Sequence, residues 1–318
     1  MRKVTMSILG LVGLAAIASL AGASGTRVVN DPSINVLEPS NQEVIYRSVG
    51  GCNDCWASGI TLREAGNADG LAGGTIAVPP QVASNVVFAQ IFWVTLDNVF
   101  PPTGSITVNG NAVTAIPIGP VTGSPCWVPA NAYAFRADVS GFLVPGVNSL
   151  TGFPDSGNRN VSPSTEGVSL VIAFRSPTVD KEIIILAGND DLGFFTQQVD
   201  LSIPVTSAAG FGAELTMIVA DGQSNGSDGA PNATDAVAWN GTPISAPNAF
   251  LGLDSGPGVG FWDTEEFGVA TGGANTVSLS IGSDCLNWVG TVLCVKRGGC
   301  VVPVAPSTWS KIKSLINN

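Results

Sequence analysis

The sequence contains no histidine among its 318 residues. Histidine is the commonest general base in enzymes and the commonest protein ligand of transition metals. Its absence excludes a Ser-His-Asp or Cys-His catalytic site and every zinc centre that needs an imidazole ligand. Any chemistry in this chain must therefore use other polar side chains.

Charged side chains are also scarce, at 12% of residues against 45% hydrophobic ones, and the formal net charge is −11. A negative surface repels phosphate backbones, so nucleic acid is not expected as a partner. The chain instead has 39 glycines and 21 prolines. Low charge with many turn-forming residues favours an extracellular all-β protein whose surface assembles with other surfaces.

Long apolar runs are missing from the chain after its N-terminus. Residues 1–23 resemble a secretory signal peptide: Arg2 and Lys3 precede the apolar run Met6–Leu20, and small residues follow it. At about 15 residues this run is shorter than the roughly 20 that span a bilayer, although an uncleaved anchor is an alternative. We therefore expect a protein secreted to the cell surface, without a membrane span after cleavage.

Six cysteines in a secreted chain predict disulfide bonds. We expect Cys285 and Cys294 to form a local bridge across a hairpin. Cys52 and Cys55 form a CNDC motif, but a redox role needs a strand that leads into a helix, and a zinc site needs a second close pair. We therefore expect structural disulfides throughout. The candidates are Cys52, Cys55, Cys126, Cys285, Cys294 and Cys300.

Two segments about 120 residues apart repeat the same order of features, which indicates duplicated domains. Each segment has an aromatic residue, an acidic residue, a turn with a glycine and an asparagine, and an apolar strand with a basic end. An apolar strand and an Asn-Gly hairpin signal precede each segment. The corresponding residues are Phe135 and Trp262, Asp138 and Asp263, Gly146–Asn148 and Gly273–Asn275, Arg175 and Arg297, and Asn109 and Asn240.

These patterns predict an all-β protein of two tandem jelly-roll or immunoglobulin-like β-sandwiches, with an extended N-terminal arm and a short C-terminal helix. The arm is either the first strand of the adjacent sheet, which we favour, or a strand donated to a neighbouring molecule. The expected divisions are a signal peptide at 1–23, the arm and leading strands at 24–82, the first sandwich with connecting strands at 83–206, the second sandwich at 207–300 and a tail at 301–318.

The string WDTEEFGV, followed by SDCLNWVGTVLCV, resembles a family of secreted β-sandwich proteins of unknown function found in archaeal and bacterial surface proteins. The preceding stretches EGVSLVIAFRSP and KEIIILAGND share this resemblance, which covers residues 86–297. The resemblance implies a fold and a location at the cell surface. It implies no reaction, because the shared motifs are strand cores and turns.

Two candidate binding sites stand beside simpler structural explanations. Asp221, Asp228 and Asp235 lie in one polar loop whose oxygens could hold calcium, or the loop is merely solvated. Trp127 and Trp239 could stack on a glycan; alternatively, Trp127 packs against a disulfide and Trp239 packs in the core. No other cofactor is expected.

The acidic residues do not predict a catalytic pair. Glu265 and Glu266 are adjacent, so a strand would place them on opposite faces, and Glu166 and Glu214 lie in different repeats. We therefore expect no enzyme. The favoured function is a structural or adhesive surface subunit that assembles with itself or with other surface proteins through sheet edges, and the alternative is a carbohydrate-binding module.

Overall fold

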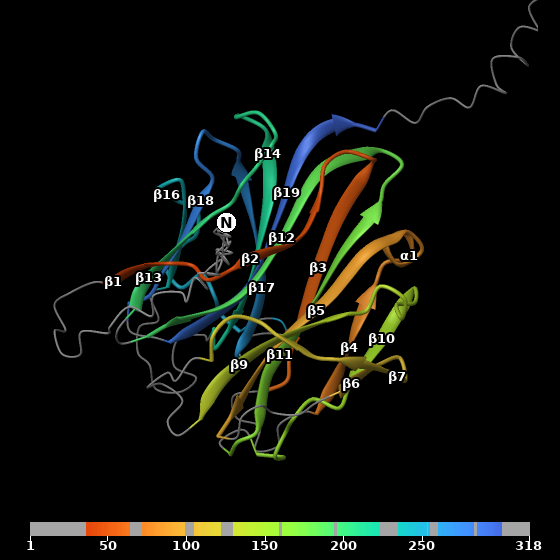
Figure 1. The fold of residues 1–318 in the computed structure, drawn as a ribbon, viewed down its shortest axis with the longest axis vertical. Coiled ribbons are helices and arrows are strands. Elements are labelled where there is room, and N and C mark those ends of the chain that lie inside the picture. Colours follow the sequence, from red (N-terminus) through yellow and green to blue (C-terminus); the bar gives the residue numbers. More distant parts are fainter. Residues whose placement is uncertain are drawn as a thin grey trace, which may run out of the picture. The chain divides into compact units, whose positions relative to one another are not determined.

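The computed structural model describes residues 36–63, 72–98, 105–121, 130–158, 161–193, 196–222, 235–252, 254, 260–282 and 285–300. All of them belong to one compact unit, Asn35–Asn318. The unit is almost entirely β-structure, with a single-turn helix α1 at Pro80–Ala83 among the described residues (Figure 1). The predicted C-terminal helix lies outside the described residues, as do residues 24–35 of the arm.

The first half of the unit is an eight-stranded sandwich. Its sheets have the strand orders β3-β11-β5-β9, extended by the short edge strand β8, and β4-β10-β6-β7. We call these inner sheet 1 and outer sheet 1. The strands are β3 (Asn53–Thr61), β4 (Gly73–Val78), β5 (Val86–Asp97), β6 (Ser105–Val108), β7 (Asn111–Thr114), β8 (Ile116–Pro117), β9 (Asn131–Asp138), β10 (Gly146–Thr151) and β11 (Ser164–Arg175).

The second half repeats this arrangement strand for strand. Inner sheet 2 has the order β17-β14-β19-β12-β2, and outer sheet 2 has the order β1-β13-β18-β15-β16. The strands are β1 (Val36–Pro39), β2 (Glu43–Ser48), β12 (Val179–Leu192), β13 (Thr196–Ser202), β14 (Gly212–Ala220), β15 (Ala236–Trp239), β16 (Thr242–Pro243), β17 (Trp262–Ala270), β18 (Thr276–Ser280) and β19 (Leu286–Gly299).

Both halves have the jelly-roll topology. We leave out β1, β2 and β8 and number the remaining eight strands of each half from one to eight in chain order. In both halves the inner sheet then has the order 1-8-3-6 and the outer sheet has the order 2-7-4-5. This double Greek-key order is that of a jelly roll. The predicted all-β fold with paired sandwiches is therefore confirmed, and the topology selects the jelly roll over the immunoglobulin-like alternative.

The copies begin earlier in the sequence than the repeated motifs suggest. The first roll extends from β3 to β11 and the second from β12 to β19, with only Ser176–Thr178 between them. Strands β12 and β13, which we grouped with the first sandwich, pair in the sheets of the second roll. They are the counterparts of β3 and β4.

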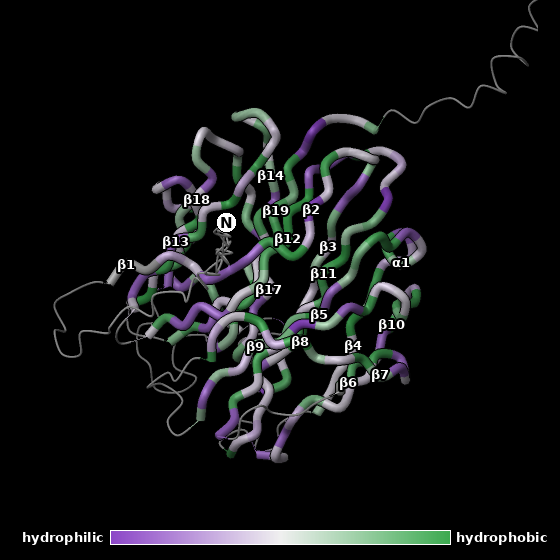
Figure 2. The backbone as a smooth tube through the Cα atoms, in the orientation of Figure 1, coloured by the Kyte–Doolittle hydropathy of each residue, from purple (hydrophilic) through white to green (hydrophobic). Residues whose placement is uncertain are grey.

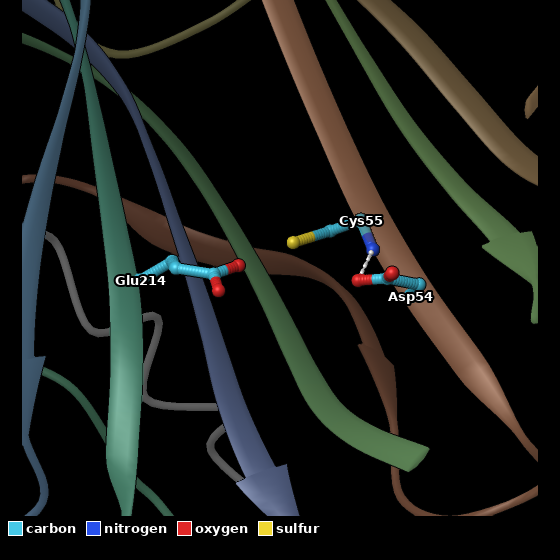
Figure 3. Close-up of side chains that lie close together, drawn as sticks. All are labelled: Asp54, Cys55 and Glu214. Atoms are coloured by element: carbon cyan, nitrogen blue, oxygen red, sulfur yellow. Dashed lines mark hydrogen bonds between the residues drawn. The ribbon is translucent and has the colours of Figure 1, made fainter. Parts of the chain in front are cut away.

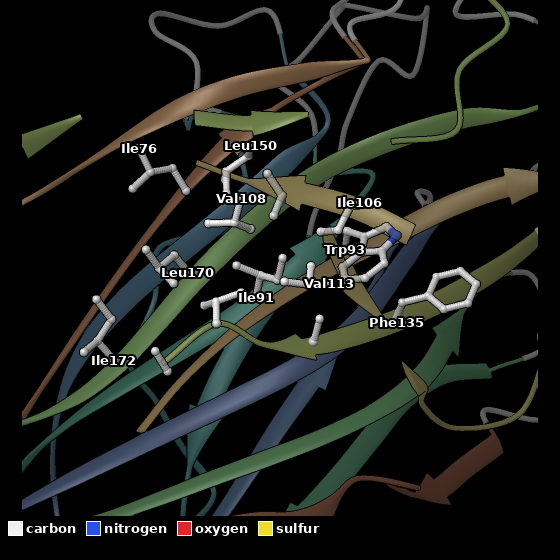
Figure 4. Close-up of a cluster of buried hydrophobic side chains, with 14 of the residues drawn as sticks. Ile76, Ile91, Trp93, Ile106, Val108, Val113, Phe135, Leu150, Leu170 and Ile172 are labelled. Atoms are coloured by element: carbon white, nitrogen blue, oxygen red, sulfur yellow. The ribbon is translucent and has the colours of Figure 1, made fainter. Parts of the chain in front are cut away.

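Three buried clusters hold four sheets together in the order outer 1, inner 1, inner 2, outer 2. The first cluster fills the first roll and includes Trp93, Ile106 and Leu170 (Figure 4). The second cluster fills the second roll around Trp288. The third, with Phe92 and its neighbours, lies between the two inner sheets. Because the inner sheets are covered on both faces, their central strands β5 and β19 are buried over most of their length and consist mainly of hydrophobic residues (Figure 2).

The two Asn-Gly hairpins confirm the duplication in atomic detail. Asn109 and Asn240 both adopt positive φ, 50° and 51°, and each is followed by a glycine with positive φ. Each asparagine Oδ1 also accepts a 2.9 Å hydrogen bond from a neighbouring strand, from the backbone N–H of Ser149 and of Thr276. Asparagine and glycine tolerate this left-handed backbone, which fits the twist of the hairpin strands.

The N-terminal strand pairs within its own chain. β1 runs parallel to β13, with Glu38 beside Val199, and β2 pairs with β12. Between β1 and β2, the backbone N–H of Asn41 donates a 2.8 Å hydrogen bond to Asp190 Oδ1. For residues 36–39 the structure thus shows the alternative that we favoured, a strand that belongs to a sheet of the same chain.

The sequence Gly188-Asn189-Asp190-Asp191 consists of turn-forming residues and predicts a turn, but the structure shows none there. β12 continues through Leu192 with a register irregularity between Ala187 and Asp190. The strand continues because β19 supplies backbone partners beyond the irregularity, where Asp190 pairs with Trp288.

In the described residues no helix has the length and hydrophobicity needed to span a membrane.

Candidate functional site

Polar side chains interrupt the apolar junction between the inner sheets along strands β3 and β17. These two strands lie at the edges of their respective sheets and contact each other across the junction. We call this line of groups the junction seam. It consists of the Lys181, Asp254 and Arg63 clusters described below. Ligand sites commonly form between domains, so the seam is the natural candidate site.

The Lys181 cluster joins the two rolls electrostatically. Lys181 on β12 is buried, and its Nζ lies 2.6 Å from Asp54 Oδ1 on β3 and 2.5 Å from Glu214 Oε2 on β14. Burial lowers the pKa of Lys181, but hydrogen bonds and charges from Asp54 and Glu214 outweigh it and raise the pKa above 10.5. The ammonium group therefore remains charged and holds two carboxylates from different rolls.

The same cluster has the ligand spacing of a metal site, with Asp54, Cys55 and Glu214 converging within 4.8 Å (Figure 3). Two features make the donor set unsuitable for a cation. The Cys55 sulfur is bonded to Cys294, so no thiolate is available. The Lys181 ammonium is already bound to both carboxylates and would repel a second positive charge. We therefore assign no metal to this cluster.

Two disulfides cross the junction near the start of β3 and the end of β19. Cys55 on β3 is bonded to Cys294 on β19, and Cys52 is bonded to Cys300. The predicted Cys285–Cys294 bridge is therefore wrong, because the tertiary fold places β19 opposite β3. Cys285 is disulfide-bonded as well, and Cys126 lies outside the described residues. Disulfides persist in oxidising compartments, so the chain matures in such an environment.

The Asp254 cluster lies farther along the seam. Thr264 Oγ1 on β17 donates a 2.7 Å hydrogen bond to Asp254 Oδ2 and lies 2.7 Å from Ser169 Oγ on β11. Burial raises the pKa of Asp254 to about 6; the Thr264 hydrogen bond opposes this shift and the Glu265 charge adds to it. Burial also raises the pKa of Glu265. Asp254 is therefore partly protonated near neutral pH.

Gly59 on β3 makes room for this cluster. A Cβ at residue 59 would collide with the Asp254 carboxylate and the Thr264 hydroxyl. The indole Nε1 of Trp262 donates a 2.8 Å hydrogen bond to Ser169 Oγ, which extends the network into the junction core. Strands from both rolls thus position the carboxyl group.

The Arg63 cluster forms the third part of the seam. Arg63 Nη1 donates a 2.7 Å hydrogen bond to Glu166 Oε1 and lies 3.5 Å from Asp221 Oδ1. Its guanidinium carbon lies 4.3 Å from the centre of the Phe261 ring. Glu166 and Phe261 are fully buried, so the cluster ties the first roll to the second through a charged group and an aromatic face.

The predicted calcium ligands are separated by their local partners. Asp221 pairs with Arg63, whereas the buried Asp235 accepts a 2.8 Å hydrogen bond from the backbone N–H of Phe250. Among the described residues, the clusters with metal-ligand spacing do not include either residue. Asp228 lies outside the described residues, and calcium binding stays a prediction.

The predicted glycan-binding tryptophans have different outcomes. Trp239 is 5% exposed, packs in the core of the second roll and donates a 2.7 Å hydrogen bond to the Ala270 carbonyl oxygen. It therefore offers no open face to a sugar. Trp127 lies outside the described residues.

The side chains of the seam were missed by sequence reasoning, because Lys181, Asp254 and Arg63 belong to no motif and meet their partners only in the folded chain.

Comparisons with known proteins find no matching family model and no curated protein that matches the sequence. Among solved structures, a peptide-N(4)-(N-acetyl-β-D-glucosaminyl)asparagine amidase is similar, with 15% identity, a TM-score of 0.28, and coverage of 78% of this chain and 98% of that one. A conserved protein of unknown function from Pseudomonas aeruginosa PAO1 has 11% identity and a TM-score of 0.27, with coverage of 80% and 90%.

A third similar structure is a β-porphyranase of glycoside hydrolase family 86 from the human gut bacterium Bacteroides plebeius. It has 12% identity and a TM-score of 0.25, with coverage of 83% of this chain and 38% of that one. Two of the three proteins are enzymes, which overturns our prediction that this chain is not one. Histidine-based catalysis remains excluded, but catalysis as such does not. Similarity of this extent assigns neither a reaction nor a family to the chain.

Proposed function

We propose that this chain is an exported structural protein that self-associates in a surface assembly. The observation that carries the proposal is the way the two rolls are joined. The inner sheets share a continuous apolar core, and disulfides close loops of 248 and 239 residues across it. Such a block resists separation of its halves, as a subunit outside the cell must, where no cellular machinery refolds it.

Composition supports the same proposal. The chain has few charges for its size, and a low-charge surface favours association over dispersal. Residues 36–39 are held within their own chain, so association is proposed through other surfaces and not through exchange of these residues.

The test is to produce residues 24–318 in an oxidising compartment and to measure molar mass by light scattering over a range of concentrations, with electron microscopy of the same samples. We expect mass to rise with concentration and ordered filaments or layers to form. A strictly monomeric protein at every concentration would overturn the proposal.

A second candidate function is supported by Asp254. A carboxyl group that is protonated near neutral pH can act as a general acid, as in hydrolases that cleave glycosidic bonds. Burial in the junction raises the pKa of Asp254 to about 6, so a fraction of it is in this protonated form, and the neighbouring Glu265 is a second carboxylate with a raised pKa. The proposed substrates are glycans or glycopeptides that reach the seam.

This candidate is tested by incubating the protein with glycopeptides and polysaccharides and following product release. Asp254→Asn should abolish any turnover without unfolding the chain, whereas Glu266→Gln, a change at an exposed position of the nearby strand β17, should preserve it. Equal turnover by wild type and Asp254→Asn, or no turnover on any substrate, would remove this candidate.

A further inference from the structure

The outward face of outer sheet 1 consists of small, uncharged side chains. Strand registers place these residues side by side, with Ser149 opposite Thr75, Val147 opposite Ala77 and Thr151 opposite Thr107. Their alternate neighbours, such as Ile76 and Leu150, point into the core. The members of the face are Thr75, Ala77, Thr107, Ala112, Thr114, Val147, Ser149 and Thr151.

Charge is missing from this whole part of the sequence. Residues 70–96, 98–135 and 139–154, which include all four strands of outer sheet 1, contain no Asp, Glu, Lys or Arg. The chain as a whole has a net charge of −11, so its charged groups are concentrated elsewhere. Two copies that meet through this face therefore avoid the repulsion between carboxylates that other orientations incur.

We propose that the outward face of outer sheet 1 is the surface through which the chain binds a second copy of itself. The proposal rests on the self-association proposed above and names one contact of that assembly. Two β-sheets pack face to face about 10 Å apart through their side chains, and the β-branched and small side chains of this face suit such packing.

The chemistry of the face favours a second copy over other occupants. Sugar-binding faces use exposed aromatic rings, and membrane-binding faces combine large apolar side chains with basic ones. The members of this face are Thr, Ser, Ala and Val, and the side chain of Val147 is 66% exposed. Neither a glycan nor a lipid surface matches such a face, whereas an identical sheet does.

The size of the face predicts how strong this contact is. Four strands about 4.8 Å apart with up to about six residues at 3.4 Å each cover roughly 400 Å². A stable pairwise interface buries about 800 Å² on each partner. A single contact is therefore weak, and it becomes appreciable at high protein concentration or when it is repeated.

The test places a charge at the centre of the face. Ser149 lies on β10, which is paired on both sides, and it is exposed. Ser149→Lys and Ser149→Glu, each measured alone by sedimentation equilibrium, should associate at least about tenfold more weakly than wild type because like charges meet. An equimolar mixture of the two variants should recover association, because opposite charges then face each other.

The matched control is Ser202→Lys, the same change at an exposed strand position on outer sheet 2. It should associate as wild type does, and circular dichroism should show all variants folded. If wild type associates and Ser149→Lys does so equally, this inference fails while the proposed self-association stands. If wild type does not associate at any concentration, both fail.

Discussion

At the scale of single residues, Lys181 shows how a buried charge is stabilised by partners from both rolls. Its Nζ binds Asp54 from the first roll and Glu214 from the second, and desolvation is outweighed by these contacts. Removing one partner of a buried ion pair leaves the other charges without compensation, which is costly. The residue therefore contributes to the junction and not merely to one sheet.

We expect Lys181→Met to lower the free energy of unfolding by about 1–3 kcal/mol, less than for a fully buried pair because both carboxylates are partly exposed. Chemical denaturation at neutral pH measures this change. The matched control is Lys296→Met, whose side chain is 60% exposed and whose Nζ lies 3.5 Å from Glu214; it should change stability by less than about 0.5 kcal/mol. Equal effects of the two variants would contradict the assigned role of Lys181.

The buried carboxyl group of Asp254 should make the stability of the protein depend on pH. Its pKa in the folded protein, about 6, lies above the ordinary aspartate value of 3.8, so the folded state disfavours the ionised form. Stability is therefore lost as pH rises through this window and is recovered below it. Asp254→Asn keeps an acceptor for Thr264 and removes the charge, so it should stabilise the fold by about 1–3 kcal/mol near pH 8.

The same variant should give a much smaller gain near pH 4, where the native carboxyl group is protonated. Calorimetry of both proteins at the two pH values measures the difference. A gain that is independent of pH would show that ionisation of Asp254 is not its cause.

At the scale of elements, the two Asn-Gly hairpins are equivalent parts of the duplicated fold. Asn109 and Asn240 each combine a left-handed backbone with a side-chain hydrogen bond to the next strand. Each asparagine therefore fixes the register of its hairpin and also the position of the adjacent strand that donates to its side chain. This is a stronger constraint than the backbone conformation alone.

Replacing either asparagine with alanine should destabilise the protein by about 1–2 kcal/mol, because alanine resists positive φ and provides no acceptor. Denaturant unfolding of Asn109→Ala and Asn240→Ala measures the effect. Asn111→Ala is the control, since Asn111 is exposed and makes only hydrogen bonds of 3.2 and 3.3 Å. A loss at residue 111 as large as at residue 109 would refute the argument from turn geometry.

At the scale of the whole molecule, the shared core between the inner sheets should make the two rolls unfold together. Phe92 and Trp262 come from different rolls and are both fully buried in this core. Separating the rolls would expose it and leave the seam charges unpaired. We therefore expect one calorimetric transition for the described unit, and two well-separated transitions would contradict this coupling.

The disulfides act at the same scale, because they restrict the unfolded chain over most of its length. The double variant Cys52→Ala/Cys300→Ala should lower the free energy of unfolding by about 2–5 kcal/mol. Its transition should stay single, because the junction core is unchanged. A loss of cooperativity would show that the bond, and not the packing, joins the rolls.

The sequence by itself determined the class of the fold, the duplication and the hairpin turns. These depend on local properties: alternating or continuous apolar strands, Asn-Gly pairs and a high content of turn-forming residues. The central strands β5 and β14 have mostly apolar sequences on both faces, which is the pattern of strands covered on both sides. The absence of histidine, likewise, limits the chemistry whatever the fold is.

Only the tertiary structure decided which strands begin each roll, which cysteines pair and where the polar groups meet. Cys55 and Cys294 are 239 residues apart in sequence, and Lys181 meets Asp54 because β12 and β3 face each other across the junction. Such contacts are fixed by how two inner sheets pack. No local pattern encodes them, because each residue's partner lies on a strand brought near by the packing of the two rolls.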